Sequence, residues 1–215
     1  ARIVASSGAR GTAMHKILEK YILGEGYMDM TTVGQEAHNM AKVVIEQGLC
    51  NLTEYYGSET VLYYPGLYAG QTDLIASHQN EMAVIDFKQT NKPKKRERIE
   101  DYCVQLAAYT MAHNYVHKTN ISKGVIMMCS KDNYYQEFII KGLEMKKYMH
   151  LFLKKVDEYY DEVEVELEEP TGAELDSCIS PENVKEFLKA RIEETISEEY
   201  DEIFHSSDGK PPLLN

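Results

Sequence analysis

Two aspartates and a lysine lie on neighbouring short apolar runs in the middle of the sequence. Asp73 ends the stretch Gly-Gln-Thr-Asp, and Asp86 and Lys88 belong to Asp-Phe-Lys, thirteen residues further on. Side chains alternate along a strand, so Asp86 and Lys88 share one face. In a hairpin that turns near residue 79, Asp73 lies opposite Asp86, and the two carboxylates can converge on one cation. Oxygen ligands that leave room for water suit Mg²⁺ or Mn²⁺.

The chemistry expected of such a site is hydrolysis of a phosphodiester bond. A divalent metal can activate water and offset negative charge in the transition state. Lys88 near that metal can position or deprotonate the attacking water, or stabilise the developing charge. The same Asp-x-Lys pattern also occurs on solvated strand faces, so both interpretations stay open when the pattern is taken alone.

Apolar periodicity predicts the elements that must position these residues. Helical spacing is expected over residues 11–23, 32–47, 99–115 and 142–160, with Gly48 ending the second helix. Strands are expected at 59–64, 67–77, 82–90, 124–129 and 134–140, and the first three read as an antiparallel meander because turn residues separate them. Ser180-Pro181 is typical of a helix start.

Composition favours one globular domain with an appendage. The chain has 215 residues, of which 43% are hydrophobic and 27% charged. No apolar run approaches the roughly 20 residues that cross a bilayer. We therefore expect no membrane association and an intracellular protein, in a bacterial or phage-infected cytoplasm rather than a mitochondrion. Four cysteines stand far apart, which predicts reduced thiols rather than a zinc or iron-sulfur site.

The net charge of -12 is unevenly distributed. Residues 157–202 hold 18 Asp/Glu and 3 Lys/Arg, whereas residues 1–156 hold 19 Lys/Arg and 16 Asp/Glu. Encounter with DNA depends on the local field, so the overall acidity does not exclude a nucleic-acid substrate. We predict a catalytic domain at 1–160 and an acidic helical extension at 161–215. The extension could shield the cleft, dock a protein partner or keep the chain in solution.

These residues, in their order along the chain, resemble the signature motif of the PD-(D/E)XK nuclease superfamily. Asp73, Asp86 and Lys88 take the places of its two metal ligands and its catalytic lysine. Upstream, Gly-Thr-Ala-Met-His resembles the G-x-x-x-H helix of RecB-type exonucleases, and downstream Gln-Leu-Ala-Ala-Tyr resembles their Q-x-x-x-Y helix. The similarity spans about residues 11–160 and includes the mitochondrial genome maintenance exonucleases and phage-encoded relatives.

The resemblance implies a fold, a metal site and a DNA contact. The fold is an α/β restriction-endonuclease-like core, a central mixed β-sheet flanked by helices. The metal, Mg²⁺ or Mn²⁺, is held by His15, Asp73, Asp86 and the backbone carbonyl of Phe87. Glu59 is either a further ligand or only a charge on an edge strand.

DNA contacts are expected on both sides of the lysine. By the resemblance, Gln105 and Tyr109 flank the site and help to hold DNA. Five cations just after the catalytic strand would attract phosphates without reading sequence, although a solubilising loop is the alternative; these are Lys92, Lys94, Lys95, Arg96 and Arg98.

The expected function is a metal-dependent exonuclease acting on single-stranded DNA ends in replication, repair or recombination. A structure-specific or double-strand nuclease is a second interpretation within the same fold. The third is a DNA-binding or scaffold protein that kept the fold without the activity. The complete set His15, Asp73, Asp86 and Lys88 argues against the third, because nothing structural requires these four residue types together.

Overall fold

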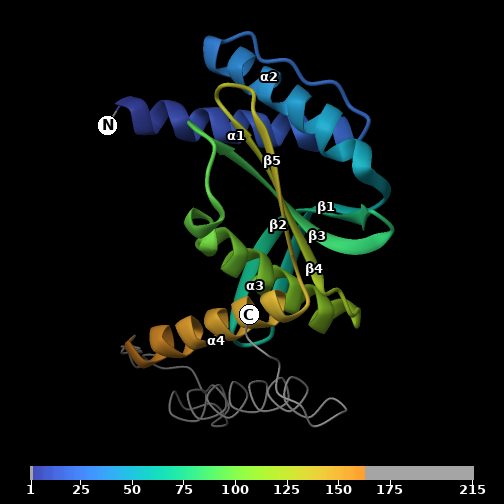
Figure 1. Ribbon diagram of the computed structural model, residues 1–215, viewed down its shortest axis with the longest axis vertical. Coiled ribbons are helices and arrows are strands. Elements are labelled where there is room, and N and C mark those ends of the chain that lie inside the picture. The colour runs from blue at the N-terminus through green and yellow to red at the C-terminus, as the bar shows by residue number, and fades with distance from the viewer. Residues whose placement is uncertain (1, 163–215) are drawn as a thin grey trace, which may run out of the picture. The chain divides into compact units, whose positions relative to one another are not determined.

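A five-stranded mixed sheet forms the centre of the structure, a computed structural model that describes residues 2–162 (Figure 1). The strands lie in the order of the chain: β1 (Leu52–Tyr64), β2 (Tyr68–His78), β3 (Glu81–Thr90), β4 (Lys123–Ser130) and β5 (Tyr135–Lys141). Neighbours are antiparallel except β3 and β4, which run parallel and are joined through a helix. The predicted α/β class with a mixed sheet is confirmed, as is the meander of the first three strands.

Helices cover both faces of this sheet (Figure 1). On one face, α1 (Arg2–Ile22) packs on α2 (Thr32–Gln47) and contacts β3, while α2 contacts β4 and β5. On the other face, α3 (Glu100–His117) contacts the first four strands. Two single 3₁₀ turns, Leu49–Asn51 and Arg96–Arg98, precede β1 and α3, and α4 (Leu143–Glu162) follows β5.

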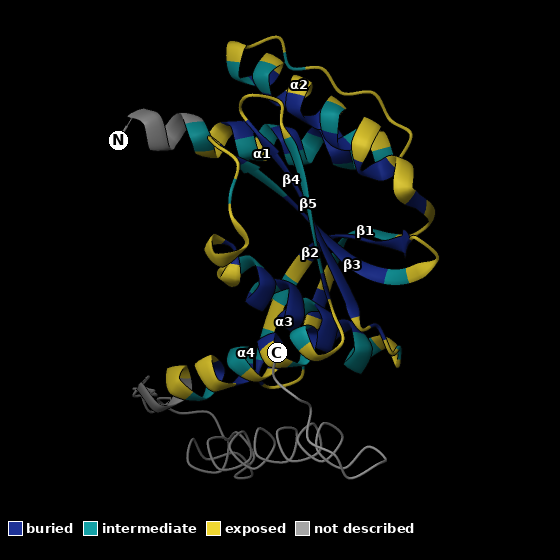
Figure 2. Cartoon of the chain, viewed as in Figure 1, coloured by how far each residue is buried: buried dark blue, intermediate teal, exposed yellow. Residues whose placement is uncertain are grey.

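The apolar stripe of each helix explains its place in the core. Buried and exposed residues alternate along α2 (Figure 2). Met14 and Leu18, one turn apart on α1, and Met40 and Val44 on α2 are all essentially inaccessible to solvent. Thr31 caps α2 by accepting a hydrogen bond from the amide of Gly34. Burial of these stripes fixes α1 against the sheet, and α1 carries His15.

Two element boundaries differ from the sequence prediction. Helix α1 begins at Arg2 instead of residue 11, and β1 begins at Leu52 instead of residue 59. The first half of β1 lies at the edge of the sheet, is largely exposed and contains register shifts before Glu54 and Gly57. A bulged edge strand loses the alternation of apolar residues that makes a strand visible in sequence.

The chain divides into two units, residues 1–148 and 149–215, and all functional residues discussed below lie in the first. The predicted boundary at residue 160 and the extension beyond it stay predictions, and the helix expected at Ser180 lies outside the described residues. None of the helices within residues 2–162 is long and apolar enough to span a membrane. Within the same range the cysteines are free thiols.

Candidate active site

The site lies where β2 and β3 separate. Their pairing ends at Leu74 and Ile85, so Asp73 and Asp86 are the next residues on the two strands, as the hairpin prediction required. Beyond the last paired residues, a side chain links the two strands: Asp73 Oδ2 accepts a hydrogen bond from the main-chain amide of Phe87 at 2.6 Å. The first aspartate is thereby fixed beside the strand that carries Asp86 and Lys88.

His15 reaches the same aspartate from the opposite layer. Its Nδ1 lies 3.1 Å from Asp73 Oδ1. Burial acts to lower the pKa of His15, but the hydrogen bond and charge of Asp73 outweigh it and raise that pKa above the usual value. Helix α1 can approach β3 this closely because Gly11 has no side chain. A Cβ at Gly11 would lie only 3.2 Å from Cγ of Gln89.

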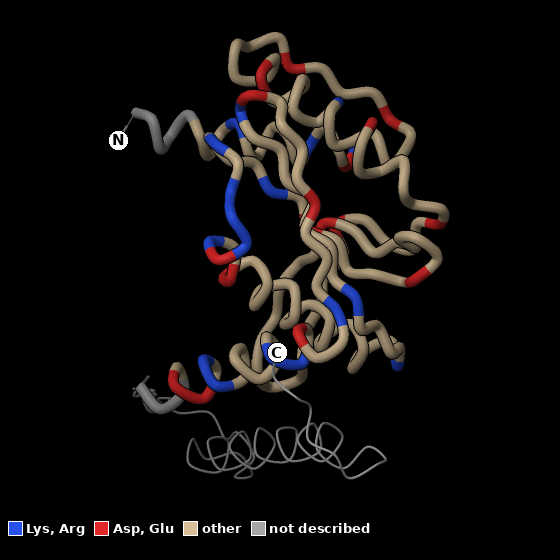
Figure 3. The backbone as a smooth tube through the Cα atoms, in the orientation of Figure 1, with Lys and Arg blue, Asp and Glu red and all other residues tan. Residues whose placement is uncertain are grey.

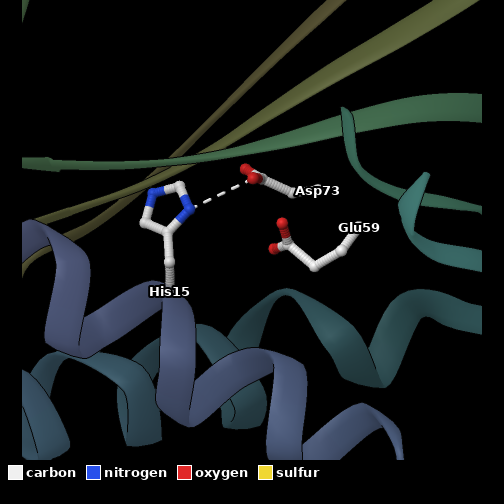
Figure 4. Close-up of side chains that lie close together, drawn as sticks. All are labelled: His15, Glu59 and Asp73. Carbon is white, nitrogen blue, oxygen red and sulfur yellow. Dashed lines mark hydrogen bonds and ion pairs between the residues drawn. The ribbon is translucent and has the colours of Figure 1, made fainter. Parts of the chain in front are cut away.

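Glu59 completes a group of three metal-ligating side chains. One ligand atom each from His15, Glu59 and Asp73 lies within 4.8 Å of the others, and Figure 4 shows the three converging from α1, β1 and β2. Glu59 lies across from Asp73, because the residues on either side of it pair with Leu74 and Thr72. Its backbone is left-handed, with φ of 50°, a conformation that costs energy for a residue with a Cβ.

The environment of Glu59 is that of a carboxylate crowded by another. Burial and then the charge of Asp73 raise the pKa of Glu59 above its usual value. Gln71 Nε2 donates to Glu59 Oε2 at 2.7 Å and to its carbonyl at 3.1 Å, which holds the residue in place. A nitrogen and two carboxylates so arranged suit a divalent cation, whose charge would relieve their repulsion.

Asp86 and Lys88 form a second group on the α3 face of the sheet. Lys88 Nζ lies 2.6 Å from Asp86 Oδ2, and only 4% of Asp86 is exposed. Burial raises the pKa of Asp86 to about 6, although the positive charge of Lys88 works against that rise. Asp86 Oδ2 has no hydrogen bond of good geometry, so the Lys88 ammonium is its one charged neighbour among the contacts of the described residues. Asp86 is not one of the three residues in the compact metal-ligating group.

Gln105 and Tyr109 lie beside this ion pair. Lys88 Nζ donates to Gln105 Oε1 at 3.0 Å, and Gln105 Nε2 donates to the Tyr109 hydroxyl at 2.8 Å. The ring of Tyr109 packs against Gly70 on β2, where a Cβ would lie 2.6 Å from Tyr109 Cε1. The glycine of Gly-Gln-Thr-Asp therefore has a packing role. Both residues contact the lysine side of the site, and their contact with DNA stays a prediction.

Figure 3 shows the run of Lys and Arg residues in the segment that follows β3. Some of these cations are paired within the protein, and others are exposed. Arg96 is held by Glu144, at 2.6 Å, and by the carbonyl of Ile139, so it has a structural partner. Lys94 donates to the Tyr102 hydroxyl at 2.8 Å and lies over that ring. Within the described residues, no hydrogen bond or ion pair holds the exposed side chains of Lys92, Lys95 and Arg98.

Sequence reasoning missed a buried arginine that joins α1 to β3. Arg10 is 2% exposed, and its guanidinium donates to Gln89 Oε1 at 3.0 Å, Asn91 Oδ1 at 2.5 Å and Glu36 Oε2 at 3.3 Å. Gln89 in turn donates to Ser7. The side chain of Gln89 is therefore occupied by hydrogen bonds inside the protein. Arg10 precedes His15 by little more than one helical turn, and no local pattern marked it.

The sequence matches the model of the PD-(D/E)XK nuclease superfamily over residues 54–208. Among solved structures, the fold is similar to a "Putative exonuclease" from Eubacterium rectale, with a TM-score of 0.50 and 11% sequence identity over 95% of this chain and 77% of that one. No curated protein matches the chain.

This chain belongs to the PD-(D/E)XK nuclease superfamily, because the family match covers most of its length. The predicted membership of the superfamily and the predicted restriction-endonuclease-like fold are both confirmed, whereas the RecB-type subgroup stays a prediction. The matched range contains Asp73, Asp86 and Lys88 but begins after α1, so the match does not include His15, which the structure places beside Asp73.

Proposed function

We propose that this nuclease is a metal-dependent DNA exonuclease that hydrolyses phosphodiester bonds at single-stranded ends, in replication, repair or recombination. The observation that carries the proposal is the adjacency of two groups. His15, Glu59 and Asp73 form a compact set of metal-ligating atoms. On the next strand, Lys88 is ion-paired with the buried Asp86. This combination suits metal-assisted hydrolysis in which the Lys88 ammonium group is held beside the metal ion.

The residues present fit Mg²⁺ or Mn²⁺. Asp73 and Glu59 supply hard oxygen donors and His15 supplies a nitrogen within the compact group, and Asp86 and the Phe87 carbonyl lie on the neighbouring stretch of β3. A histidine in the set favours Mn²⁺ relative to a site made only of oxygen, since Mg²⁺ prefers oxygen ligands. When bound, the ion supplies activation of water and stabilisation of charge on the phosphate.

The protein residues on the other side orient the strand and offset charge. Lys88, held by Asp86 and Gln105, is placed to position the attacking water or to stabilise the phosphate as negative charge develops. Gln105 and Tyr109 steady the strand beside it. The next phosphates of the DNA strand are attracted by the exposed cations Lys92, Lys95 and Arg98. Arg96 contributes only to the electrostatic field of the segment, because its side chain is already paired with Glu144.

The predicted domain boundary belongs to the same proposal. Residues 1–160 would hold the nuclease and residues 161–215 an acidic extension for a protein partner, although the family match itself runs on to residue 208. Removal of residues 165–215 should leave the specific activity unchanged, measured on a truncated protein that remains folded. Loss of activity in such a protein would place part of the catalytic domain in the acidic segment.

The test is digestion of oligonucleotides labelled at the 5′ or the 3′ end, as single strands and as duplexes, in Mg²⁺, Mn²⁺ or EDTA. We expect progressive shortening of the single strand in either metal and none in EDTA. The label that is lost first gives the polarity. Cleavage at internal positions or a preference for duplex would favour a structure-specific nuclease, and no cleavage of any substrate would favour the non-catalytic binding protein.

A further inference from the structure

A cavity of about 750 Å³ adjoins the candidate metal ligands and has no role in the function proposed so far. Its wall is formed by α1, by the segment that joins α1 to α2 and by Glu59 of β1; the lining residues are Ala9, Gly11, Thr12, Ala13, His15, Lys16, Glu19, Tyr27, Asp29 and Glu59. The volume falls within the roughly 300–1,000 Å³ of small-molecule sites. Because His15 and Glu59 line it, its occupant would lie directly beside the metal ligands.

The charges around this cavity disfavour a phosphate group. Glu19, Asp29 and Glu59 line it, and Lys16 is its single lysine or arginine. That lysine is paired with Glu19 at 2.7 Å, which offsets its charge. A phosphate inside the cavity, away from a bound metal ion, would therefore meet net negative charge. None of the residues 92–98 lines it, so the cations that attract a DNA backbone lie elsewhere.

The shape and chemistry of the wall suit a flat, uncharged ring. The α1 wall of the cavity has little side-chain bulk at Ala9, Gly11 and Ala13, which leaves space for a ring. Tyr27 supplies a partly exposed aromatic ring. Aromatic side chains stack on nucleobases regardless of sequence. Asp29 uses Oδ1 to hold the amide and hydroxyl of Thr31, which leaves Oδ2 to accept a hydrogen bond from an amino group at the edge of a base.

We propose that this cavity binds the base of the terminal nucleotide of a DNA strand. The scissile phosphate then lies at His15, Glu59 and Asp73, and the rest of the strand runs towards the basic residues 92–98. A base can enter only when it is unpaired, which gives a physical reason for preferring single-stranded ends. This inference rests on the proposed exonuclease function and adds a contact that selects the end of the strand.

The test compares two single strands of identical sequence, one ending in a normal nucleotide and one ending in an abasic nucleotide at the degraded end. Removal of the terminal residue is followed in Mn²⁺ for the parent protein and for Tyr27→Ala, Tyr27→Phe and Tyr134→Ala. Tyr134 is a matched control, because it is an exposed tyrosine outside the cavity.

We expect the parent to remove the normal nucleotide about tenfold faster in kcat/KM than the abasic one, which is the size of one base-stacking contact. The ratio should approach one in Tyr27→Ala and should be retained in Tyr27→Phe and Tyr134→Ala. A folded Tyr27→Ala protein that keeps the ratio would overturn the proposal.

Equal rates on both strands in the parent would also overturn the cavity proposal while leaving the exonuclease function intact. Absence of metal-dependent cleavage in the parent would overturn both. A ratio that falls equally in Tyr27→Ala and Tyr134→Ala would show that the discrimination does not arise in this cavity and would overturn the proposal.

Discussion

Asp73 Oδ2 accepts the main-chain amide hydrogen of Phe87 at 2.6 Å, at the point where the pairing of β2 and β3 has ended. This contact gives the aspartate two tasks. One oxygen accepts a buried amide hydrogen of β3, and the other faces His15. Substitutions at Asp73 should therefore separate structural from metal-binding effects.

Asp73→Ala should lower the free energy of unfolding by about 1–3 kcal/mol, since it leaves the Phe87 amide buried without an acceptor. Asp73→Asn can still accept that amide, and its Nδ2 can donate to His15. It also removes one charge from a crowded group, so we expect it to be at least as stable as the parent in EDTA. Urea denaturation measures the free energy of unfolding of both variants. Equal destabilisation by Ala and Asn would contradict the dual role.

Gly70→Ala should disturb the lysine side of the site through Tyr109. The new methyl group would lie 2.6 Å from the Tyr109 ring, which must move and weaken its bond to Gln105. Overpacking of this kind costs about 1–3 kcal/mol. Gly8→Ala is the matched control, because nothing lies within 4 Å of its Cβ and alanine favours a helix. Thermal unfolding that ranks Gly70→Ala as stable as Gly8→Ala would refute the packing role.

Neutralising the three exposed, unpaired cations should weaken DNA binding without changing stability. For Lys92→Gln, Lys95→Gln and Arg98→Gln combined, the slope of log affinity against log salt should fall by about 2, at roughly 0.7 for each phosphate on a single strand. Binding is measured by fluorescence anisotropy in EDTA. Lys42→Gln, Lys118→Gln and Lys147→Gln combined carry the same change in charge and should leave the slope nearly unchanged. An equal effect from both triples would favour the solubilising loop.

The stability of the fold should depend on pH through His78. Burial lowers the pKa of His78 below 6.5, although Glu137, 3.3 Å away, partly opposes the shift. The unfolded chain therefore takes up the proton first, so stability is lost as pH falls below about 6.5. Between pH 7.5 and 5, the parent should lose more stability than His78→Gln. His38→Gln, on the exposed face of α2, should lose as much stability over this pH range as the parent. If the difference in stability between the parent and His78→Gln is the same at both pH values, His78 is not the group responsible.

Short-range sequence patterns predicted the sheet and the relative placement of the candidate site residues on β2 and β3, because each depends on local spacing. Strand alternation put Asp86 and Lys88 on one face, and the hairpin put Asp73 opposite Asp86. Helical spacing placed Gln105 and Tyr109 one turn apart, where they form a hydrogen bond. His15 needed the family resemblance, since a single histidine on an amphipathic helix does not indicate which strand it will face.

Contacts between distant segments could not be predicted in this way. Arg10 lies 79 residues from Gln89, and Arg96 lies 48 residues from Glu144. An arginine that is buried or paired in the structure cannot be told apart in the sequence from one that faces solvent. The unusual backbone of Glu59 also escaped prediction, because its left-handed conformation arises within a bulged edge strand and not from a turn residue.

In the proposed hydrolysis, Lys88 acts together with the metal ligands. The most direct test of this role is the rate of shortening of an end-labelled single strand in saturating Mn²⁺, compared for the parent, Lys88→Ala and the exposed control Lys42→Ala. We predict a fall of about 10²–10³-fold in kcat for Lys88→Ala alone, since one charge-stabilising group is lost. Cleavage by folded Lys88→Ala at the rate of the parent would show that Lys88 takes no part in hydrolysis.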